Sequence, residues 1–108
     1  MKLQFERHPH SICAVLTDAG ECDRIITVTR PSDAFDVFAL DINAAAFTPL
    51  DTLFALPRVV CVEIEQRSGG WRVEVAYWHK GLGTLAQYEA EAATLSKAIA
   101  HCVWALAR

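Results

Sequence analysis

Three segments with strand character, separated by turns, constrain the fold of this chain more than any other feature. The segments Val59–Gln66, Trp71–His79 and Thr84–Ala92 are rich in β-branched and aromatic residues or alternate between polar and apolar, which is typical of half-buried strands. The stretches Arg67-Ser68-Gly69-Gly70 and Lys80-Gly81-Leu82-Gly83 between them have the composition of tight turns. The pattern therefore predicts an antiparallel meander.

A capped amphipathic helix is predicted after the third strand. Thr94 can accept a hydrogen bond from the first turn, and apolar side chains recur behind it at helical spacing. These side chains are Leu95, Ile99, Cys102, Val103 and Leu106. Because such a stripe needs an apolar surface to cover it, we expect the helix to pack on the sheet.

The N-terminal part of the chain predicts further strands. Leu3 and Phe5 alternate with polar residues, as in a short half-buried strand. Ser11–Thr17 and Arg24–Thr29 have β-compatible composition, and the stretch Asp18-Ala19-Gly20-Glu21 has turn chemistry. A hairpin is the simplest interpretation.

The middle of the chain is more ambiguous. Arg30–Asp33 predicts a break, and Ala34–Phe47 fits either a helix with its aromatic residues on one face or a strand, of which we favour the strand. A short helix near 49–55 is a clearer prediction. Thr48 can cap it and Pro49 suits the first helical position.

Together these elements predict an α+β fold: an antiparallel β-sheet meander backed by a C-terminal α-helix, with the N-terminal strands extending or facing the sheet. The 108 residues fit one domain, and the chain holds enough large apolar side chains for a single core. Since neither a repeat nor a linker is visible, we expect a single domain over residues 1–108.

The charge balance excludes several classes of function. Ten basic and 13 acidic side chains give a formal net charge of −3, which argues against a protein that binds nucleic acid directly by neutralising phosphates. The chain lacks an uncharged apolar run of the roughly 18 residues that suggest a membrane span. Its charged start also lacks the apolar centre of a signal peptide. We therefore expect a cytoplasmic protein with reduced cysteines and no membrane contact.

Strand alternation also predicts which side chains share the sheet face turned away from the helix. Val60, Val62 and Ile64 are expected to point toward the helix. The opposite face would carry Glu63, Glu65, Arg72, Glu74, Trp78, Gln87, Glu89 and Glu91. Such a face concentrates negative potential and suits a basic groove, with Trp78 as the central contact. The alternative is the solvated side of a one-faced sheet, which is polar whatever the function.

Motifs for catalysis or cofactor binding are not found. Glu63 and Glu65 could offer oxygen ligands to Mg²⁺, but the sequence fixes no further carboxylate beside them, and Gln66 and Arg67 stand where a nuclease lysine would be sought. His8 and His10 could approach zinc, yet structural zinc needs four ligands and the paired cysteine spacing is missing. We expect neither an enzyme nor a bound metal or other cofactor.

The last 40 residues or so resemble the ends of many small bacteriophage or prophage proteins. A Trp-bearing strand, Gly70-Trp71-Arg72-Val73-Glu74-Val75, is followed by a second strand that leads through Ala93-Thr94-Leu95 into a terminal helix. The resemblance implies an anti-defence inhibitor similar to anti-CRISPR proteins, which dock on a host effector and block its nucleic-acid or nuclease surface. A phage-encoded protein of this kind would act in the host-cell cytoplasm.

Residues and resemblance together predict a non-enzymatic protein-binding module that inhibits a host nucleic-acid-handling complex. Its partner would be a host protein or ribonucleoprotein effector. The binding residues would be Glu63, Glu65, Glu74, Trp78, Glu89 and Glu91. The alternative is a self-associating structural or assembly protein, for example a homodimer, because the low content of charged residues leaves apolar surface that association would cover.

Overall fold

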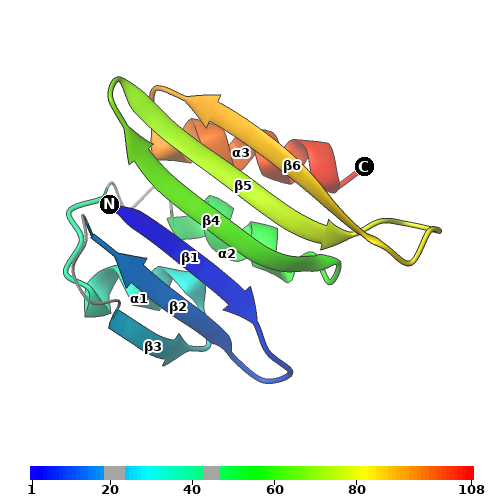
Figure 1. Ribbon diagram of the computed structural model, residues 1–108, viewed down its shortest axis with the longest axis horizontal. Coiled ribbons are helices and arrows are strands. Elements are labelled where there is room, and N and C mark those ends of the chain that lie inside the picture. Colours follow the sequence, from blue (N-terminus) through cyan, green and yellow to red (C-terminus); the bar gives the residue numbers. More distant parts are fainter. Residues whose placement is uncertain (19–23, 43–46) are drawn as a thin grey trace.

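The computed structural model describes residues 1–18, 24–42 and 47–108, and these form a sheet and a layer of helices (Figure 1). The fold is α+β, as predicted. In chain order the elements are β1 (Lys2–Arg7), β2 (Ile12–Thr17), β3 (Arg24–Val28), α1 (Pro31–Val37), α2 (Phe47–Ala55), β4 (Val59–Arg67), β5 (Gly70–Trp78), β6 (Leu85–Ala92) and α3 (Leu95–Leu106).

The strands form one six-stranded antiparallel sheet in the order β3-β2-β1-β4-β5-β6. Two meanders, β1 to β3 and β4 to β6, lie side by side and join where β1 pairs with β4. The N-terminal strands therefore extend the sheet rather than facing it, which decides between the two arrangements that the sequence allowed. The edge strands of this sheet are β3 and β6.

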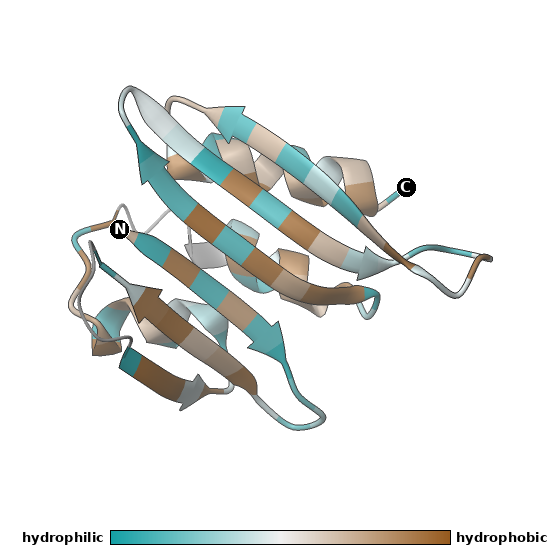
Figure 2. Cartoon of the chain, viewed as in Figure 1, coloured by the Kyte–Doolittle hydropathy of each residue, from teal (hydrophilic) through white to brown (hydrophobic). Residues whose placement is uncertain are grey.

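The helices cover one face of the sheet and lie behind it in Figure 1. α3 packs on β5 and β6, α1 contacts β2 and β3, and α2 contacts the other two helices. Figure 2 shows polar and apolar residues alternating along β1, β4 and β5, as a sheet with one buried face requires. We call the other side the open face. It carries Lys2, Gln4, Glu6, Cys13, Val15, Thr17, Ile25, Thr27, Cys61, Glu63, Glu65, Arg67, Arg72, Glu74, Ala76, Trp78, Leu85, Gln87, Glu89 and Glu91.

The core lies between the sheet and the helices, and Phe5 is central to its N-terminal part. Its side chain is fully buried, and its ring centroid lies 6.0 Å from those of Phe35 in α1 and Phe54 in α2. Tilted and edge-on arrangements of this kind favour aromatic pairs. One residue of β1 thus holds two helices against the sheet.

The strand favoured at 34–47 is wrong, because its first residues belong to the helix α1. Pro31 lies in the first turn, where its missing N–H costs nothing, and Asp33 suits the positive helix start. The predicted break at 30–33 is therefore the start of this helix. Ala34 and Phe35 share its buried face. Residues 43–46 of the predicted segment lie outside the described part of the chain.

The other predicted elements are confirmed with small shifts. α2 begins at Phe47, earlier than the predicted short helix, and Thr94 caps α3 by accepting a hydrogen bond from the Lys97 N–H at 3.3 Å. A register shift between Val59 and Cys61 marks a β-bulge, so Val59 rather than Val60 is buried. Most of the turn predicted at 18–21 lies outside the described residues. In the described chain, no helix has the length and apolarity to cross a membrane.

Arg7 fixes the junction between α2 and β4. Its Nη2 donates hydrogen bonds to the carbonyls of Phe54 and Leu56, and its Nε donates to the carbonyl of Val59 at 2.6 Å. Carbonyls at the end of a helix lack partners within the helix, and a cation there also suits the helix dipole. The Arg7 guanidinium, 5.5 Å from the centroid of the Phe54 ring, therefore ties β1 to the start of β4.

This role makes Arg7 important for stability. Replacement of Arg7 by Met keeps the apolar part of the side chain but removes the donor to three carbonyls, of which that of Leu56 still accepts from the Val59 N–H. We expect the free energy of unfolding at pH 7 to fall by about 1.5–3 kcal/mol, as measured by urea denaturation. Arg30→Met is the control, because Arg30 forms an exposed pair with Asp33 and should matter much less. Equal losses in the two variants would contradict this assignment.

Candidate functional site

The sheet register places the residues predicted for the site in neighbouring rows across the open face. One row contains Lys2, Glu65, Arg72 and Glu91. The next row contains Gln4, Glu63, Glu74 and Glu89. Because directly opposed side chains in a sheet lie about 4.5–5.5 Å apart at Cβ, this register brings carboxylates from three strands together around one arginine.

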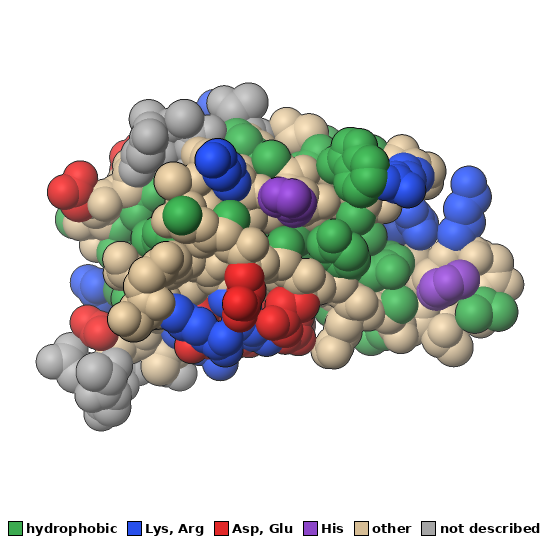
Figure 3. Space-filling view, turned by 90° about the horizontal axis from the view of Figure 1, so that it is seen from above, with side chains coloured by type: hydrophobic (Ala, Val, Ile, Leu, Met, Phe, Trp, Pro, Cys, Tyr) green, Lys and Arg blue, Asp and Glu red, His purple; other side chains and the backbone are tan. Residues whose placement is uncertain are grey.

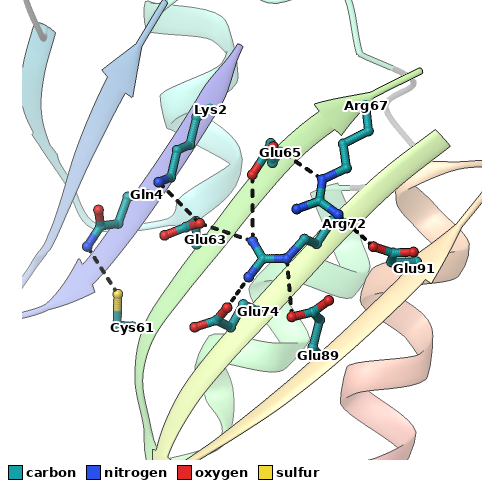
Figure 4. Close-up of polar contacts among 10 residues, drawn as sticks. All are labelled: Lys2, Gln4, Cys61, Glu63, Glu65, Arg67, Arg72, Glu74, Glu89 and Glu91. Carbon is teal, nitrogen blue, oxygen red and sulfur yellow. Dashed lines mark hydrogen bonds and ion pairs between the residues drawn. The ribbon is translucent and has the colours of Figure 1, made fainter. Parts of the chain in front are cut away.

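Arg72 lies at the centre of these carboxylates (Figure 4). Its Nη1 is 3.1 Å from Glu63 Oε1 and 3.7 Å from Glu65 Oε2. Its Nη2 donates to Glu74, and its Nε is 3.2 Å from Glu89 Oε2. With neighbours on both flanking strands, the Arg72 side chain is only 11% exposed. A single guanidinium therefore pairs with four carboxylates.

Two further cations complete this group at its borders. Lys2 Nζ lies 3.3 Å from Glu63 Oε1. Arg67 Nη1 lies 2.9 Å from Glu91 Oε1, and its Nε lies 3.2 Å from Glu65 Oε1. We call the whole group the Arg72 cluster, consisting of Lys2, Glu63, Glu65, Arg67, Arg72, Glu74, Glu89 and Glu91. Five carboxylates and three cations leave it a net charge of −2.

The cluster shifts the pKa values of two of its members, Glu65 and Arg72. The hydrogen bond from Arg67 lowers the pKa of Glu65 against the opposing effect of desolvation, and the charges of Arg67, Arg72 and Lys2 add to it. Desolvation acts to lower the pKa of Arg72, but its hydrogen bond to Glu63 and the charges of Glu89 and Glu74 raise it on balance. Both shifts favour the ionised forms of Glu65 and Arg72.

The carboxylates of Glu63 and Glu65 are not arranged as ligands of a magnesium ion. The oxygens of these side chains face the cations Lys2, Arg67 and Arg72. The guanidinium of Arg72 occupies the position between the carboxylates that a metal ion would need. Within residues 1–18, 24–42 and 47–108, no group of three or more His, Cys, Asp or Glu side chains is placed to hold a metal.

An exposed apolar pair lies on the open face beyond the Arg72 cluster. Trp78 of β5 is 47% exposed and stands opposite Leu85 of β6, which is 55% exposed. Along β5, Trp78 lies four positions after Glu74, a distance of about 13 Å. The structure therefore brings the six residues predicted for binding onto one face, with the five glutamates in the cluster and Trp78 separated from them by the Ala76–Gln87 pair.

The cysteines described in the structure are free thiols. Cys61 stands on the open face, and burial raises its pKa against the hydrogen bond from Gln4 Nε2 at 3.5 Å. Burial also raises the pKa of Cys102 to about 12. Since a thiolate is the reactive form, neither residue has the properties of a nucleophile at neutral pH.

A separate hollow of about 390 Å³ lies between the β1–β2 connection, the start of α1 and the end of α2, and is lined in part by Arg7, His8, His10, Arg30 and Asp51. Of its charged groups, Arg7 and Asp51 join neighbouring elements, and Arg30 pairs within the start of α1. Arg7 donates to backbone carbonyls, Arg30 pairs with Asp33, and Asp51 accepts from a backbone N–H of α1. We therefore interpret this hollow as a structural feature of the fold.

Strand alternation predicted one cation on this face, Arg72, and not Lys2 or Arg67. Lys2 comes from β1, whose pairing with β4 joins residues about 60 positions apart and leaves no local signal. Arg67 was assigned to a turn, whereas it is the last residue of β4. Comparison of the chain with protein-family models, curated proteins and solved structures finds no match.

The Arg72 cluster predicts a pH-dependent effect of mutation. Arg72→Met removes the shared cation and leaves carboxylates facing one another, so the free energy of unfolding at pH 7 should fall by about 1–3 kcal/mol. Carboxylates gain protons as the pH falls from 7 to 3, so the same substitution should cost less at pH 3.

The stability of the wild-type protein should itself fall as the pH is lowered. Because the folded-state pKa of Glu65 lies below its usual 4.5, its stabilising pairs are complete above that pH and are lost as the pH falls through the folded value. Urea denaturation of both proteins at pH 7 and pH 3 tests this. An Arg72→Met loss of equal size at the two pH values would show that charge pairing is not what Arg72 contributes.

Proposed function

We propose that this protein is a non-enzymatic protein-binding module that docks on its partner through the open face. The observation that carries the proposal is the exposed pair Trp78 and Leu85 on the same sheet face as the Arg72 cluster, a face that no described helix covers. The cluster presents charge in fixed positions, and the pair presents apolar area. The expected partner surface has charged groups that complement the cluster and apolar area that covers the pair.

Trp78 is proposed as the main contact. Buried aromatic side chains, tryptophan above all, carry much of the binding energy of protein interfaces. Trp78 lies near the end of the nine-residue strand β5, opposite Leu85 of β6. A side chain already positioned by a sheet loses less conformational freedom on binding than one on a loop.

The exposed part of the Arg72 cluster is proposed to contact basic groups of the partner. The side chains of Glu89 and Glu91 are 49% and 58% exposed, whereas those of Glu63 and Glu74 are about half as exposed. Figure 3 shows acidic and basic side chains gathered in one patch at the lower side of that view. The net charge of the cluster favours approach to a positive surface and disfavours nucleic-acid phosphates.

The structure therefore suggests separate roles for the predicted binding residues. Trp78, Glu89 and Glu91 would contact the partner. Glu63, Glu65 and Glu74 would hold Arg72 in place. Glu89 also pairs with Arg72, so it would have both roles. Reversing all five glutamates would surround Arg72 with like charges, so a test of docking should change only the exposed ones.

The proposed partner is a host protein or ribonucleoprotein effector with a basic groove for nucleic acid. This follows the resemblance of residues 70–99 to the ends of small phage proteins of the anti-CRISPR kind. Covering such a groove would inhibit it, because its lysines and arginines would no longer meet phosphates. The phage origin and the action in the host-cell cytoplasm stay predictions.

Two exposed tryptophans give a matched test of this proposal. Trp104 is 65% exposed on α3, in the helix layer, whereas Trp78 stands on the open face. We expect Trp78→Ala to weaken binding of the captured partner about 30-fold, corresponding to about 2 kcal/mol, and Trp104→Ala to leave it unchanged. Capture from bacterial lysate would identify the partner, and calorimetry with the purified partner would give the dissociation constants.

A second variant tests the charge and the inhibition. Glu89→Lys/Glu91→Lys should weaken binding and reduce its dependence on salt. Wild-type protein should also displace nucleic acid from the captured partner in a competition assay. If Trp78→Ala and the double variant both bind like the wild type, the open face is not the docking surface.

A further inference from the structure

Within the described residues, the edge strand β3 lacks the features that usually keep an edge from pairing with another chain. Natural edge strands are protected by charges, prolines, bulges or a cover. The five residues of β3 are Arg-Ile-Ile-Thr-Val, and those on the open face are Ile25 and Thr27, with Ile25 65% exposed. Their neighbours on β2, Val15 and Cys13, are also uncharged. Figure 2 shows β2 and β3 as hydrophobic along most of their length.

The single charged residue of β3 does not protect the edge. Arg24 lies on the helix side of the sheet, with its guanidinium 5.4 Å from the centroid of the Phe38 ring. Its charge is therefore directed toward α1 and away from the open face. Short segments of β-branched residues with little charge pair readily when their backbone is unpaired.

The opposite edge has the reverse character. β6 carries Glu89 and Glu91 on the open face, in a cluster with net negative charge. A second copy placed along β6 would bring these carboxylates close to their equivalents, which is unfavourable. Of the two sheet edges, only β3 is therefore free of like-charge repulsion between copies.

We propose that β3 pairs antiparallel with β3 of a second copy, joining two six-stranded sheets edge to edge. Opposed residues in an antiparallel pair must point to the same face, and only a register centred on Ile26 pairs all five residues of each strand. Ile25 then stands opposite Thr27 of the second copy. Such β-branched cross-strand pairs stabilise sheets.

This register also separates the two arginines. Arg24 stands opposite Val28 of the second copy, so the two Arg24 residues lie at opposite ends of the pairing, about 13 Å apart along the strand direction. The proposal rests on the β3 edge alone and does not depend on docking through Trp78. The occupant is a second copy because the strand is self-complementary in both side-chain type and charge.

The register allows a charge-complementation experiment. Ile25→Lys/Thr27→Lys places lysines opposite lysines in a homodimer, and Ile25→Glu/Thr27→Glu places glutamates opposite glutamates. In a mixture of the two variants each lysine meets a glutamate. Ile25 and Thr27 are exposed, so both variants should fold, which circular dichroism and thermal unfolding can check.

Sedimentation velocity over about 1–500 μM protein should show a wild-type dimer. Each variant alone should raise the dimer dissociation constant at least about tenfold, and an equimolar mixture should restore dimers. The matched control is Leu85→Lys/Gln87→Lys, which makes the same kind of change on the open face of β6 and should leave the dimer intact.

Three results would overturn the proposal. These are a wild-type protein that stays monomeric over the whole range, a dimer that persists in Ile25→Lys/Thr27→Lys, and variants that fail to dimerise when mixed. Failure of the docking proposal is recognised separately, because Trp78→Ala would then bind the partner like the wild type whatever the association state.

Discussion

The antiparallel pairing of β1 with β4 is the interaction on which the rest of the structure depends. It joins strands about 60 residues apart in sequence and turns two three-stranded meanders into one sheet. Leu3 and Phe5 thereby become neighbours of Ile64 and Val62, so the buried face is continuous from β3 to β6. The same pairing places Lys2 beside the carboxylates of β4 on the other face. One long-range contact therefore creates both the core and the charged surface.

The Arg72 cluster shows how a sheet can carry many carboxylates on one face without strong repulsion. Desolvation of Arg72 opposes its charged form, yet Glu63, Glu89 and Glu74 more than offset this effect and raise its pKa. Arg67 and Lys2 neutralise part of the remainder. Such a network holds its side chains in defined positions. Its inner carboxylates, those of Glu63, Glu65 and Glu74, pair with Arg72. The charge left for a partner is concentrated on Glu89 and Glu91.

Strand alternation and helical spacing correctly predicted the features that depend on residues close together in the sequence. Alternation placed the six residues of the candidate site on one face, and the spacing of Leu95, Ile99 and Cys102 predicted the buried side of α3. The helix α1 was missed because seven residues are about two turns, too few for helical and strand periods to differ clearly. The cations at the border of the cluster were missed because their positions depend on the β1–β4 pairing and on the last residue of β4. The bulge at Val60 was not predicted either, because strand alternation assumes a regular strand.

The two halves of the sheet differ in a way that makes both proposed associations compatible. On the open face, β4 to β6 carry seven of the eight members of the Arg72 cluster together with Trp78, whereas β2 and β3 carry uncharged residues only. Pairing of two copies through β3 has its two-fold axis perpendicular to the sheet, because opposed residues keep to the same face. Both open faces would then point the same way, with the two docking patches at the far ends of the joined sheet. Such a dimer would engage a partner with two equivalent grooves at once, and its avidity would exceed the affinity of either patch alone.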